Sequence, residues 1–354
     1  MRILIVTDAW HPQVNGVVRT LTSLRDHLAS SGYQPVMVTP EQFTSIPCPT
    51  YPEIRLALLP GRKMARTIES LRPCVVHIAT EGPLGLTARK YCVGRGIPFT
   101  TAYHTKFPEY LAARSPIPAA LTYKGMRWFH KHSSAVMVAT QTVEDELVKQ
   151  GFSNIKRWSR GVDTALFRPW DNNRGDKNFL NLPRPIALYC GRVAVEKNIE
   201  AFLALPEPKS KVVVGDGPQM EHLAKKYPGA IFVGLKEGEE LARIYAAADV
   251  FVFPSLTDTF GLVLLEALAC GVPVAAYPVA GPRDVIGDAP VGCLHEDLGV
   301  AVREALKASP DACRRHAEKF SWAASTAQFI DNVRPFPPGS YFACLLYTSD
   351  AADE

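Results

Sequence analysis

Residues 250–276, VFVFPSLTDTFGLVLLEALACGVPVAA, contain the strand–loop–helix–strand pattern that decides the fold. Residues 250–253 form a short apolar run typical of a buried strand. Residues 261–269 are apolar on almost every side, which predicts a buried helix, and Gly271 can end that helix in a left-handed conformation. The strand of residues 272–276 follows. This unit is typical of open parallel sheets, where ligands bind in the loops at the carboxyl ends of the strands.

Two carboxylates lie within this stretch. Asp258 falls in the loop, and Glu266 falls within the apolar helix. A carboxylate among apolar side chains carries a large desolvation cost unless a hydrogen-bonding group pairs with it. Glu266 therefore needs a partner, and the hydroxyl groups of a sugar are good candidates.

The rest of the chain repeats the alternation of strands and helices, so the sequence predicts an α/β fold. A chain of 354 residues is longer than a single hydrophobic core ordinarily supports, which favours two domains. Further strands are expected at residues 2–6, 34–39, 74–78, 99–102, 135–139, 186–190, 211–214 and 231–233. Helices are expected at residues 18–28, 86–95, 114–132, 142–151 (capped by Thr142), 238–248, 299–308 and 310–320, with a short one starting at the loop 280–284.

The domain boundaries follow from changes in composition along the chain. We expect a first domain over residues 1–170 and a second over residues 186–320. Residues 171–185 are polar and rich in turn residues, which is typical of a linker. Residues 321–333 predict a helix that crosses back to the first domain. Residues 334–354 continue no pattern, and we expect them to be non-native or disordered.

Composition excludes several classes of protein. The chain is 47% hydrophobic and 21% charged, with a formal net charge of +4, which does not favour a nucleic-acid-binding protein. Its eight cysteines form no CxxC pair and no cluster with histidine, which favours reduced thiols in a cytosol over zinc or disulfides. The apolar run at residues 3–6 is short and no apolar run approaches about 20 residues, so we expect neither a signal peptide nor a membrane span.

Two loops of the first domain carry candidate ligand-binding residues. Asn15 and Gly16 lie between the first strand and the first helix, where backbone N–H groups could meet an anion. A plain turn with a helix cap explains this pair better when it is considered alone. His104 comes directly after a strand, where a ligand contact and a structural role are equally good interpretations.

The predicted helix over residues 114–132 mixes basic and aromatic side chains. Its cations are Arg114, Lys124, Arg127 and Lys131. Packing of an amphipathic surface helix on the domain is the favoured interpretation, because the charge count is modest. Contact with anionic lipid is the alternative.

In the second domain, Arg192 and Lys197 lie in one strand-to-helix loop. Two cations near a helix start can hold a diphosphate. The alternative is a solvated loop whose charges pair with Glu196 and Glu200. We favour the diphosphate site, because this loop belongs to the same sheet edge as Asp258. Gly215 begins a further tight loop, GDGP, which is unspecific, and the GxGxxG dinucleotide fingerprint is absent.

With these residues assembled, residues 1–333 resemble the retaining glycosyltransferases of family four, which have the GT-B fold of two Rossmann-like, doubly wound domains facing a cleft. The resemblance is most specific in the central stretch, which follows the family's E-x7-E signature at Ser255, Asp258, Phe260, Gly261, Glu266, Ala267, Gly271 and Pro273. Asp258 departs from the signature, which has Glu there. The NGV motif at 15–17, His104, the RGVD motif at 160–163, Arg192 and Lys197 also resemble the family.

The resemblance implies a nucleoside-diphosphate sugar as donor, with no cofactor and no metal. Arg192 and Lys197 would neutralise the departing diphosphate, and Glu266 would hold the ribose hydroxyls. The donor sugar and base would be contacted by a wider set of residues: Asn15, Gly16, His104, Gly215, Leu235, Asp258, Thr259, Phe260, Gly261 and Leu262. His104 would also stabilise positive charge at the anomeric carbon, and the configuration there would be retained.

Among the subgroups, the motifs NGVVRT, YHTKFPEY and TDTFG resemble bacterial α-mannosyltransferases that make mannosylated lipids, and their sulfoquinovosyl relatives. GDP-mannose is therefore the expected donor, with a UDP-sugar as the alternative. The expected acceptor is a lipid or a glycan. The expected location is the cytoplasm, either free or peripheral at the inner face of the plasma membrane and in contact with anionic lipid.

Two other classes of protein remain as alternatives. An NAD-dependent oxidoreductase would share the doubly wound sheet, but the missing GxGxxG fingerprint and the Arg192/Lys197 pair count against it. A binding module that has kept the sugar-nucleotide site without turnover is the second, and Asp258 in place of Glu is the one feature in its favour. Release of GDP or UDP from a labelled sugar nucleotide separates a transferase from such a module.

Overall fold

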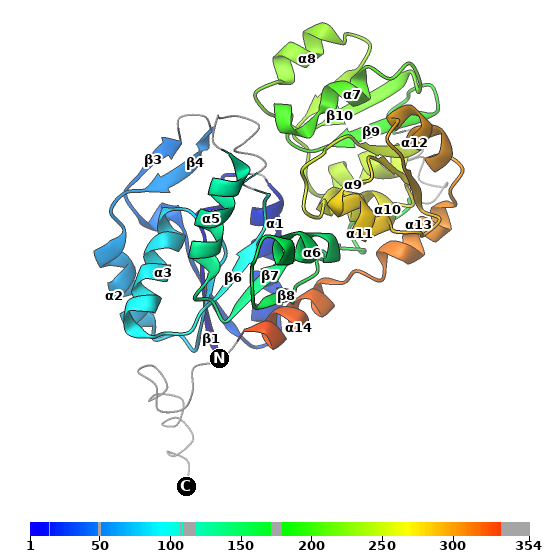
Figure 1. Ribbon diagram of the computed structural model, residues 1–354. Coiled ribbons are helices and arrows are strands. Elements are labelled where there is room, and N and C mark those ends of the chain that lie inside the picture. The colour runs from blue at the N-terminus through cyan, green and yellow to red at the C-terminus, as the bar shows by residue number, and fades with distance from the viewer. Residues whose placement is uncertain (14, 49–50, 107, 109–117, 171–178, 334–354) are drawn as a thin grey trace. The chain divides into compact units, whose positions relative to one another are not determined.

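The computed structural model describes residues 1–13, 15–48, 51–106, 108, 118–170 and 179–333, and the chain divides into two compact units (Figure 1). Unit 1 comprises residues 1–139, residues 144–158 and the chain from Thr326 on, and unit 2 comprises residues 140–143 and 159–325. Residues 159–170, which the sequence assigned to the first domain, thus group with unit 2. Part of the expected linker (171–178) and the expected tail (334–354) lie outside the described residues.

Unit 1 is built on a parallel six-stranded sheet in the order β2-β1-β5-β6-β7-β8. Its strands are β1 (Arg2–Val6), β2 (Gln34–Val38), β5 (Val75–Ile78), β6 (Thr100–Tyr103), β7 (Ala135–Val138) and β8 (Ile155–Arg157). The helices are α1 (Gly16–Ser30), α2 (Gly61–Leu71), α3 (Pro83–Arg95), α5 (Ala119–His130) and α6 (Gln141–Lys149), whose first turn falls in unit 2.

Two apolar cores form in unit 1. The first contains Met64 of α2, Leu84 of α3 and Phe129 of α5, so these three helices share one core with the sheet. The second contains Leu21 of α1 and Phe329 of α14 (Trp322–Asn332). The final helix predicted over residues 321–333 is therefore present, and Phe329 is fully buried in unit 1.

The chain between the second and third predicted strands holds elements that the sequence did not indicate. Strands β3 (Ser45–Cys48) and β4 (Tyr51–Ala57) pair in an antiparallel hairpin, after the short 3-10 helix η1 (Pro40–Gln42), and α2 follows. Each strand carries a proline, which weakens a strand signal. The short elements β8 in unit 1 and α8 (Met220–Lys226) and β14 (Gly292–Leu294) in unit 2 were likewise not predicted.

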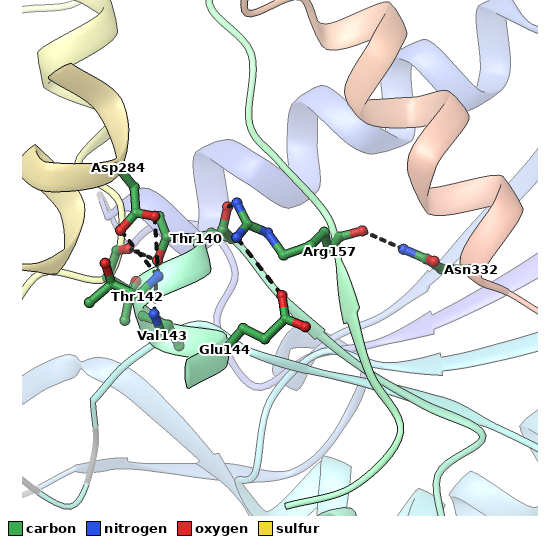
Figure 2. A network of polar contacts seen from close by, with 9 residues as sticks. Thr140, Thr142, Val143, Glu144, Arg157, Asp284 and Asn332 are labelled. Atoms are coloured by element: carbon green, nitrogen blue, oxygen red, sulfur yellow. Dashed lines mark hydrogen bonds and ion pairs between the residues drawn. The ribbon is translucent and has the colours of Figure 1, made fainter. Parts of the chain in front are cut away.

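The predicted cap of α6 is wrong. Thr142 lies within the helix, and the hydroxyl of Thr140 accepts a hydrogen bond from the Val143 N–H at 3.4 Å. The Thr142 N–H itself donates to the carboxylate of Asp284 at 3.1 Å (Figure 2). An acidic side chain distant in sequence thus satisfies an N–H group of the first turn, which no local pattern could indicate.

The strand order of unit 1 reverses between β1 and β5, the position where open α/β sheets commonly bind ligands. Here the carboxylate of Asp8 accepts hydrogen bonds from the N–H groups of Leu84 (2.8 Å) and Gly85 (3.2 Å) at the start of α3, and from the Thr80 hydroxyl (3.0 Å). Burial raises the pKa of Asp8 in spite of these bonds. The α3 N-terminus is therefore occupied by a side chain of the protein itself.

Unit 2 has a second parallel sheet, in the order β11-β10-β9-β12-β13-β14. Besides β14, its strands are β9 (Ile186–Cys190), β10 (Ser210–Val214), β11 (Ile231–Gly234), β12 (Val250–Phe253) and β13 (Val274–Ala276). Besides α8, its helices are α7 (Ile199–Leu203), α9 (Gly238–Ala247), α10 (Leu262–Ala269), α11 (Ala280–Ile286), α12 (Leu298–Ala305) and α13 (Pro310–Ala317), with the 3-10 helix η4 (Val195–Lys197) before α7. The two doubly wound sheets confirm the predicted α/β class.

The described residues contain neither a membrane-spanning helix nor a metal-binding cluster. No helix in that part of the chain is both long and apolar enough to cross a bilayer. Over the same residues, no group of three or more His, Cys, Asp and Glu side chains could hold a metal ion.

Candidate functional site: the sheet edge of unit 2

Strand order decides which loops of unit 2 meet. The strand order of this parallel sheet reverses between β9 and β12, whose residues Ala187 and Val250 are paired. The loops after these strands, residues 191–198 and 254–261, therefore leave the same sheet edge side by side. Their contact is direct, because the Asn198 side-chain amide donates to the Pro254 carbonyl at 3.2 Å. This reversal is where a ligand is expected in such a sheet.

Lys197 and Asp258 join the two loops. The ammonium of Lys197 donates to both carboxylate oxygens of Asp258, at 2.7 and 2.9 Å. The two side chains are 25% and 22% exposed, so the pair is half-buried at the sheet edge. For Lys197, the alternative pairing with Glu200 is wrong, because Glu200 accepts instead from Lys226 and from the Tyr227 hydroxyl. The alternative pairing with Glu196 stays a prediction. The ammonium of Lys197 is therefore fixed in position by Asp258.

Arg192 lies in the same loop and is half-buried. Its backbone carbonyl accepts a hydrogen bond from the hydroxyl of Tyr189 at 2.8 Å. Burial, followed by the charge of Asp258, raises the pKa of Tyr189 well above its ordinary value, so this phenol stays protonated and keeps its donor role. The backbone that carries Arg192 is thus anchored to the end of β9.

Gly215 begins the loop after β10, and the reason for a glycine there is structural. Its φ of +130° lies outside the range that other residues favour, and a Cβ atom would lie 1.9 Å from the carbonyl oxygen of Gly191. The loops after β9 and β10 can therefore approach one another only because this residue has no side chain. A donor-binding role for Gly215 stays a prediction.

Gly215→Ala is expected to destabilise the protein by about 3 kcal/mol or more, because the methyl group overlaps backbone that cannot move aside. The matched control is Gly229→Ala, where an added Cβ meets no atom within 4 Å. Urea unfolding of both variants measures the difference. Equal midpoints would show that the two loops can separate without cost.

Glu266 lies in α10 and is 5% exposed. Its Oε2 atom accepts a hydrogen bond from the hydroxyl of Tyr245 in α9 at 3.0 Å. The partner that this carboxylate needs is therefore supplied in part by the protein. Tyr245 was not recognised from the sequence, because it lies 21 residues away on a different helix and no motif spacing connects the two.

The loop before α10 is held in place by a glycine turn, a buried aromatic side chain and a hydrogen bond from a hydroxyl. Gly261 has a φ of +82° and is the N-cap of α10, so a residue tolerant of left-handed geometry turns the chain into the helix. Phe260 is buried, and the carbonyl of Thr259 accepts from the Thr140 hydroxyl at 3.2 Å within unit 2. Leu262 begins the helix.

The predicted site residues of unit 2 gather along one edge of its sheet. The neighbouring strands β11, β10, β9 and β12 end before Leu235, Gly215, the Arg192–Lys197 loop and the Asp258 loop, in that order. Leu235 is about half-exposed at the end of the edge strand. Glu266 lies on the helix that follows Asp258. The structure thus places these residues of unit 2 along one sheet edge, with a direct contact between Lys197 and Asp258. Their roles in binding a donor stay predictions.

The remaining predicted residues belong to unit 1. The Asn15 side chain accepts from the N–H groups of Val17 and Val18, both at 3.0 Å, so the helix-cap interpretation is confirmed for Asn15. A Cβ atom added to Gly16 would meet nothing within 4 Å. His104 follows β6 and packs edge-on against Trp158, with ring centroids 5.7 Å apart. Residues 107, 109 and 110 of the YHTKFPEY segment lie outside the described residues.

Comparison with known proteins identifies the family. The model of Glycosyltransferase Family 4 matches residues 14–166, and that of Glycosyl transferases group 1 matches residues 184–308. The two matches therefore fall on the two halves of the chain. Each half carries one of the doubly wound sheets.

Three relatives and one solved structure support the match. The chain is 30% identical to a GDP-mannose-dependent alpha-mannosyltransferase of Mycobacterium tuberculosis, over 81% of each chain. It is 27% identical to sulfoquinovosyl transferase SQD2 of Arabidopsis thaliana (92% of this chain, 71% of the relative). Identity to an alpha-monoglucosyldiacylglycerol synthase of Streptococcus pneumoniae is 28% (95% and 85%).

Sucrose-phosphate synthase from Thermosynechococcus elongatus has the same fold, with a TM-score of 0.75 at 22% identity over 93% of this chain and 97% of that one. The expected GT-B fold and the resemblance drawn from the motifs are thereby confirmed. The chain belongs to the family 4, group 1 glycosyltransferases, and it is a glycosyltransferase of the hexosyltransferase class.

Proposed function

We propose that this glycosyltransferase moves mannose from GDP-mannose to a lipid or glycan acceptor with retention of configuration. The observation that supports this most is the position of Lys197. Its ammonium is bonded to Asp258 at the point where the strand order of the unit 2 sheet reverses. The same loop also carries Arg192. This arrangement suits a substrate with two neighbouring negative phosphates and a polar sugar.

The leaving diphosphate gains negative charge as the glycosidic bond breaks. Arg192 and Lys197 would stabilise that charge, which is where electrostatic catalysis has its largest effect. An ammonium has three donor hydrogens, so Lys197 can contact a phosphate oxygen while it stays bonded to Asp258. No metal or cofactor enters this proposal.

The neighbouring groups would hold the rest of the donor. Asp258 and the backbone N–H groups of residues 259–262 would contact the sugar, and Glu266 would accept hydrogen bonds from the ribose hydroxyls. Tyr245 orients the Glu266 carboxylate by bonding one of its oxygens. Leu235 would contact the base through its main chain. Asp258 is shorter than the family's glutamate by one methylene. Its bond to Lys197 fixes the position of its carboxylate.

The family resemblance also suggests roles for two residues of unit 1, Gly16 and His104. The open space beside Gly16 would admit a phosphate or the sugar close to the backbone. His104 would stabilise positive charge at the anomeric carbon, because an imidazole next to an oxocarbenium centre can donate electron density. Attack by the acceptor on the face that the diphosphate leaves would retain the configuration.

GDP-mannose is proposed over a UDP-sugar because the mycobacterial relative is named for that donor. The relatives named as a sulfoquinovosyl transferase and a monoglucosyldiacylglycerol synthase favour a sugar other than mannose, and a UDP-sugar is the second candidate. A thermal-shift screen of GDP-mannose against UDP-glucose tests the choice. We expect a higher Tm with GDP-mannose, and a rise with UDP-glucose alone would transfer the proposal to the second candidate. Binding of either without release of GDP or UDP would instead identify a module without turnover.

A lipid is proposed as acceptor because one relative is named as a diacylglycerol glycolipid synthase. We further propose a cytoplasmic enzyme that contacts the membrane peripherally. Packing on the domain stays the favoured interpretation of helix α5, although Leu121 and Trp128 are exposed on it. Arg127 donates to the Gln150 carbonyl at 2.6 Å, and the Arg89 guanidinium covers the Trp128 ring at 4.0 Å, so these groups serve the fold.

Gly16→Ala is expected to leave the fold intact and to lower kcat/KM for the donor about tenfold. The first helix should gain about 0.5 kcal/mol of stability, because alanine is the better helix former. The added methyl would occupy the space proposed for the donor. Steady-state kinetics with a parallel measurement of Tm checks both effects. An unchanged kcat/KM would remove Gly16 from the donor site.

A further inference from the structure

Two guanidinium groups lie against the ring of Trp170 in unit 2. The guanidinium carbon of Arg168 is 5.2 Å from the centre of the indole ring, and that of Arg243, in α9, is 5.7 Å from it. Arg243 also covers the Phe179 ring at 4.5 Å. Stacking uses the face of a guanidinium, whose N–H groups point outward from its edge. Positive charge and hydrogen-bond donors are therefore concentrated around one indole.

The indole itself has an unsatisfied donor. The Nε1 atom of Trp170 is buried, and over the residues that the structure describes it has no hydrogen-bond partner. The side chain of Arg168 is exposed and forms no ion pair with any described residue. Buried N–H groups are nearly always paired, so one without an acceptor needs an explanation, and a bound acceptor supplies it.

A cavity of about 200 Å³ adjoins these groups. Its lining consists of Ala165, Leu166, Arg168, Trp170 and Glu239, and is called the Trp170 pocket below. Glu239 lies in the first turn of α9, and within the described part of the chain it forms no ion pair either. The pocket thus contains a cation and a carboxylate that do not neutralise one another. Sites for drug-sized ligands have about 300–1,000 Å³, so this one suits a smaller molecule.

We propose that the Trp170 pocket binds a small phosphate ester that also carries hydroxyl groups, such as the phosphate of a single sugar. Arg168 and the Trp170 N–H donate to the phosphate oxygens, and Arg243 adds its positive charge. Glu239 accepts from a hydroxyl group of the ligand.

The carboxylate of Glu239 selects between two sources of phosphate. It repels a bare inorganic phosphate, whereas an ester with hydroxyl groups offers it hydrogen-bond donors. None of the residues proposed to contact the sugar-nucleotide donor is among those that line the pocket. The site therefore goes beyond the proposed transfer reaction and does not depend on it.

Isothermal titration of the full chain with glucose 6-phosphate tests the pocket. The titrated chain carries Arg192→Ala and Lys197→Ala, because the cations of the proposed donor site also attract phosphate. We expect glucose 6-phosphate to bind to this chain. Inorganic phosphate and glucose should each bind roughly tenfold more weakly, since each lacks one half of the hydrogen bonds.

Variants in the same chain assign the binding to the pocket. Arg168→Gln should weaken binding of glucose 6-phosphate about 10- to 100-fold, because a charged donor is lost. Trp170→Phe keeps a ring for both guanidinium groups and removes the N–H, so binding should fall only a few-fold. Glu239→Ala should bind glucose 6-phosphate about fivefold more weakly and inorganic phosphate more tightly, because the repulsion is removed.

Arg303→Gln is the matched control, because it removes an exposed arginine from α12 and should change neither affinity. The Tm of each variant without ligand separates loss of binding from loss of the fold. Arg168→Gln changes an exposed position and should keep the Tm of the parent chain.

Three outcomes would overturn the proposal. The first is a chain that does not bind glucose 6-phosphate. The second is binding that Arg168→Gln leaves unchanged, which would mean that the ligand is bound elsewhere. The third is equal affinity for glucose 6-phosphate and inorganic phosphate, which would show that Glu239 does not contact the ligand. GDP or UDP release from a sugar nucleotide by the wild-type chain tests the proposed function and depends on none of these results.

Discussion

Lys197→Ala is expected to lower kcat for hexosyl transfer about 10²-fold, and Arg192→Ala is expected to do the same. Each variant removes one positive charge from the loop where the proposed leaving group becomes more negative. Because the charge develops in the transition state, the loss should fall mainly on kcat. The measurement is release of nucleoside diphosphate at saturating donor.

The control for this prediction is Lys225→Ala, which removes an exposed cation whose ion pair with Glu221 lies on the surface of α8. Its kcat should stay within about twofold of the wild type, because exposed ion pairs contribute little. Near wild-type activity in both Lys197→Ala and Arg192→Ala would mean that the diphosphate binds elsewhere.

A double-mutant cycle separates two roles for Asp258. If Asp258 acts only by positioning Lys197, then Lys197→Ala with Asp258→Ala should be no slower than Lys197→Ala alone. If Asp258 also contacts the donor sugar, the double variant should be slower again and should show a higher KM for the donor. The 2.7 Å bond between the two side chains makes this coupling measurable.

Glu266→Ala is expected to weaken donor binding by about 10- to 100-fold, which corresponds to losing hydrogen bonds to a charged group. The proposed ribose hydroxyls would lose their acceptor, so the effect should appear in the Kd for the donor. Isothermal titration with GDP-mannose, or with the donor that the thermal-shift screen selects, measures it.

Tyr245→Phe is the matched variant, because it removes the hydroxyl that bonds Glu266 and leaves the carboxylate in place. Donor affinity should fall only a few-fold, since the phenol orients the carboxylate without touching the donor. If Glu266→Ala lowers the unfolding midpoint but leaves the Kd unchanged, the carboxylate serves only to link α9 with α10.

Apolar patterning was sufficient to predict most strands of the two sheets. The runs at residues 186–190 and 250–253 became β9 and β12 with the predicted bounds, because a strand buried on both faces is a short continuous apolar segment. The hairpin of β3 and β4 could not be predicted in the same way. Its strands are stabilised by pairing with one another, and their prolines obscure any alternation.

The sequence alone also determined which residue types stand at the sheet edge of unit 2. Asp258 and Glu266 were recognised from their spacing, and Arg192 and Lys197 from their place after a strand. Local sequence carries this information because each of these residues lies within a few positions of the strand or helix that holds it.

Only the tertiary structure decided which of these groups touch. Lys197 pairs with Asp258, Tyr245 bonds Glu266, and Gly215 leaves room for the backbone of Gly191. Each contact joins segments far apart in the chain, across neighbouring strands or helices. Strand order brings such segments together, and periodicity within one segment contains no information about its neighbours.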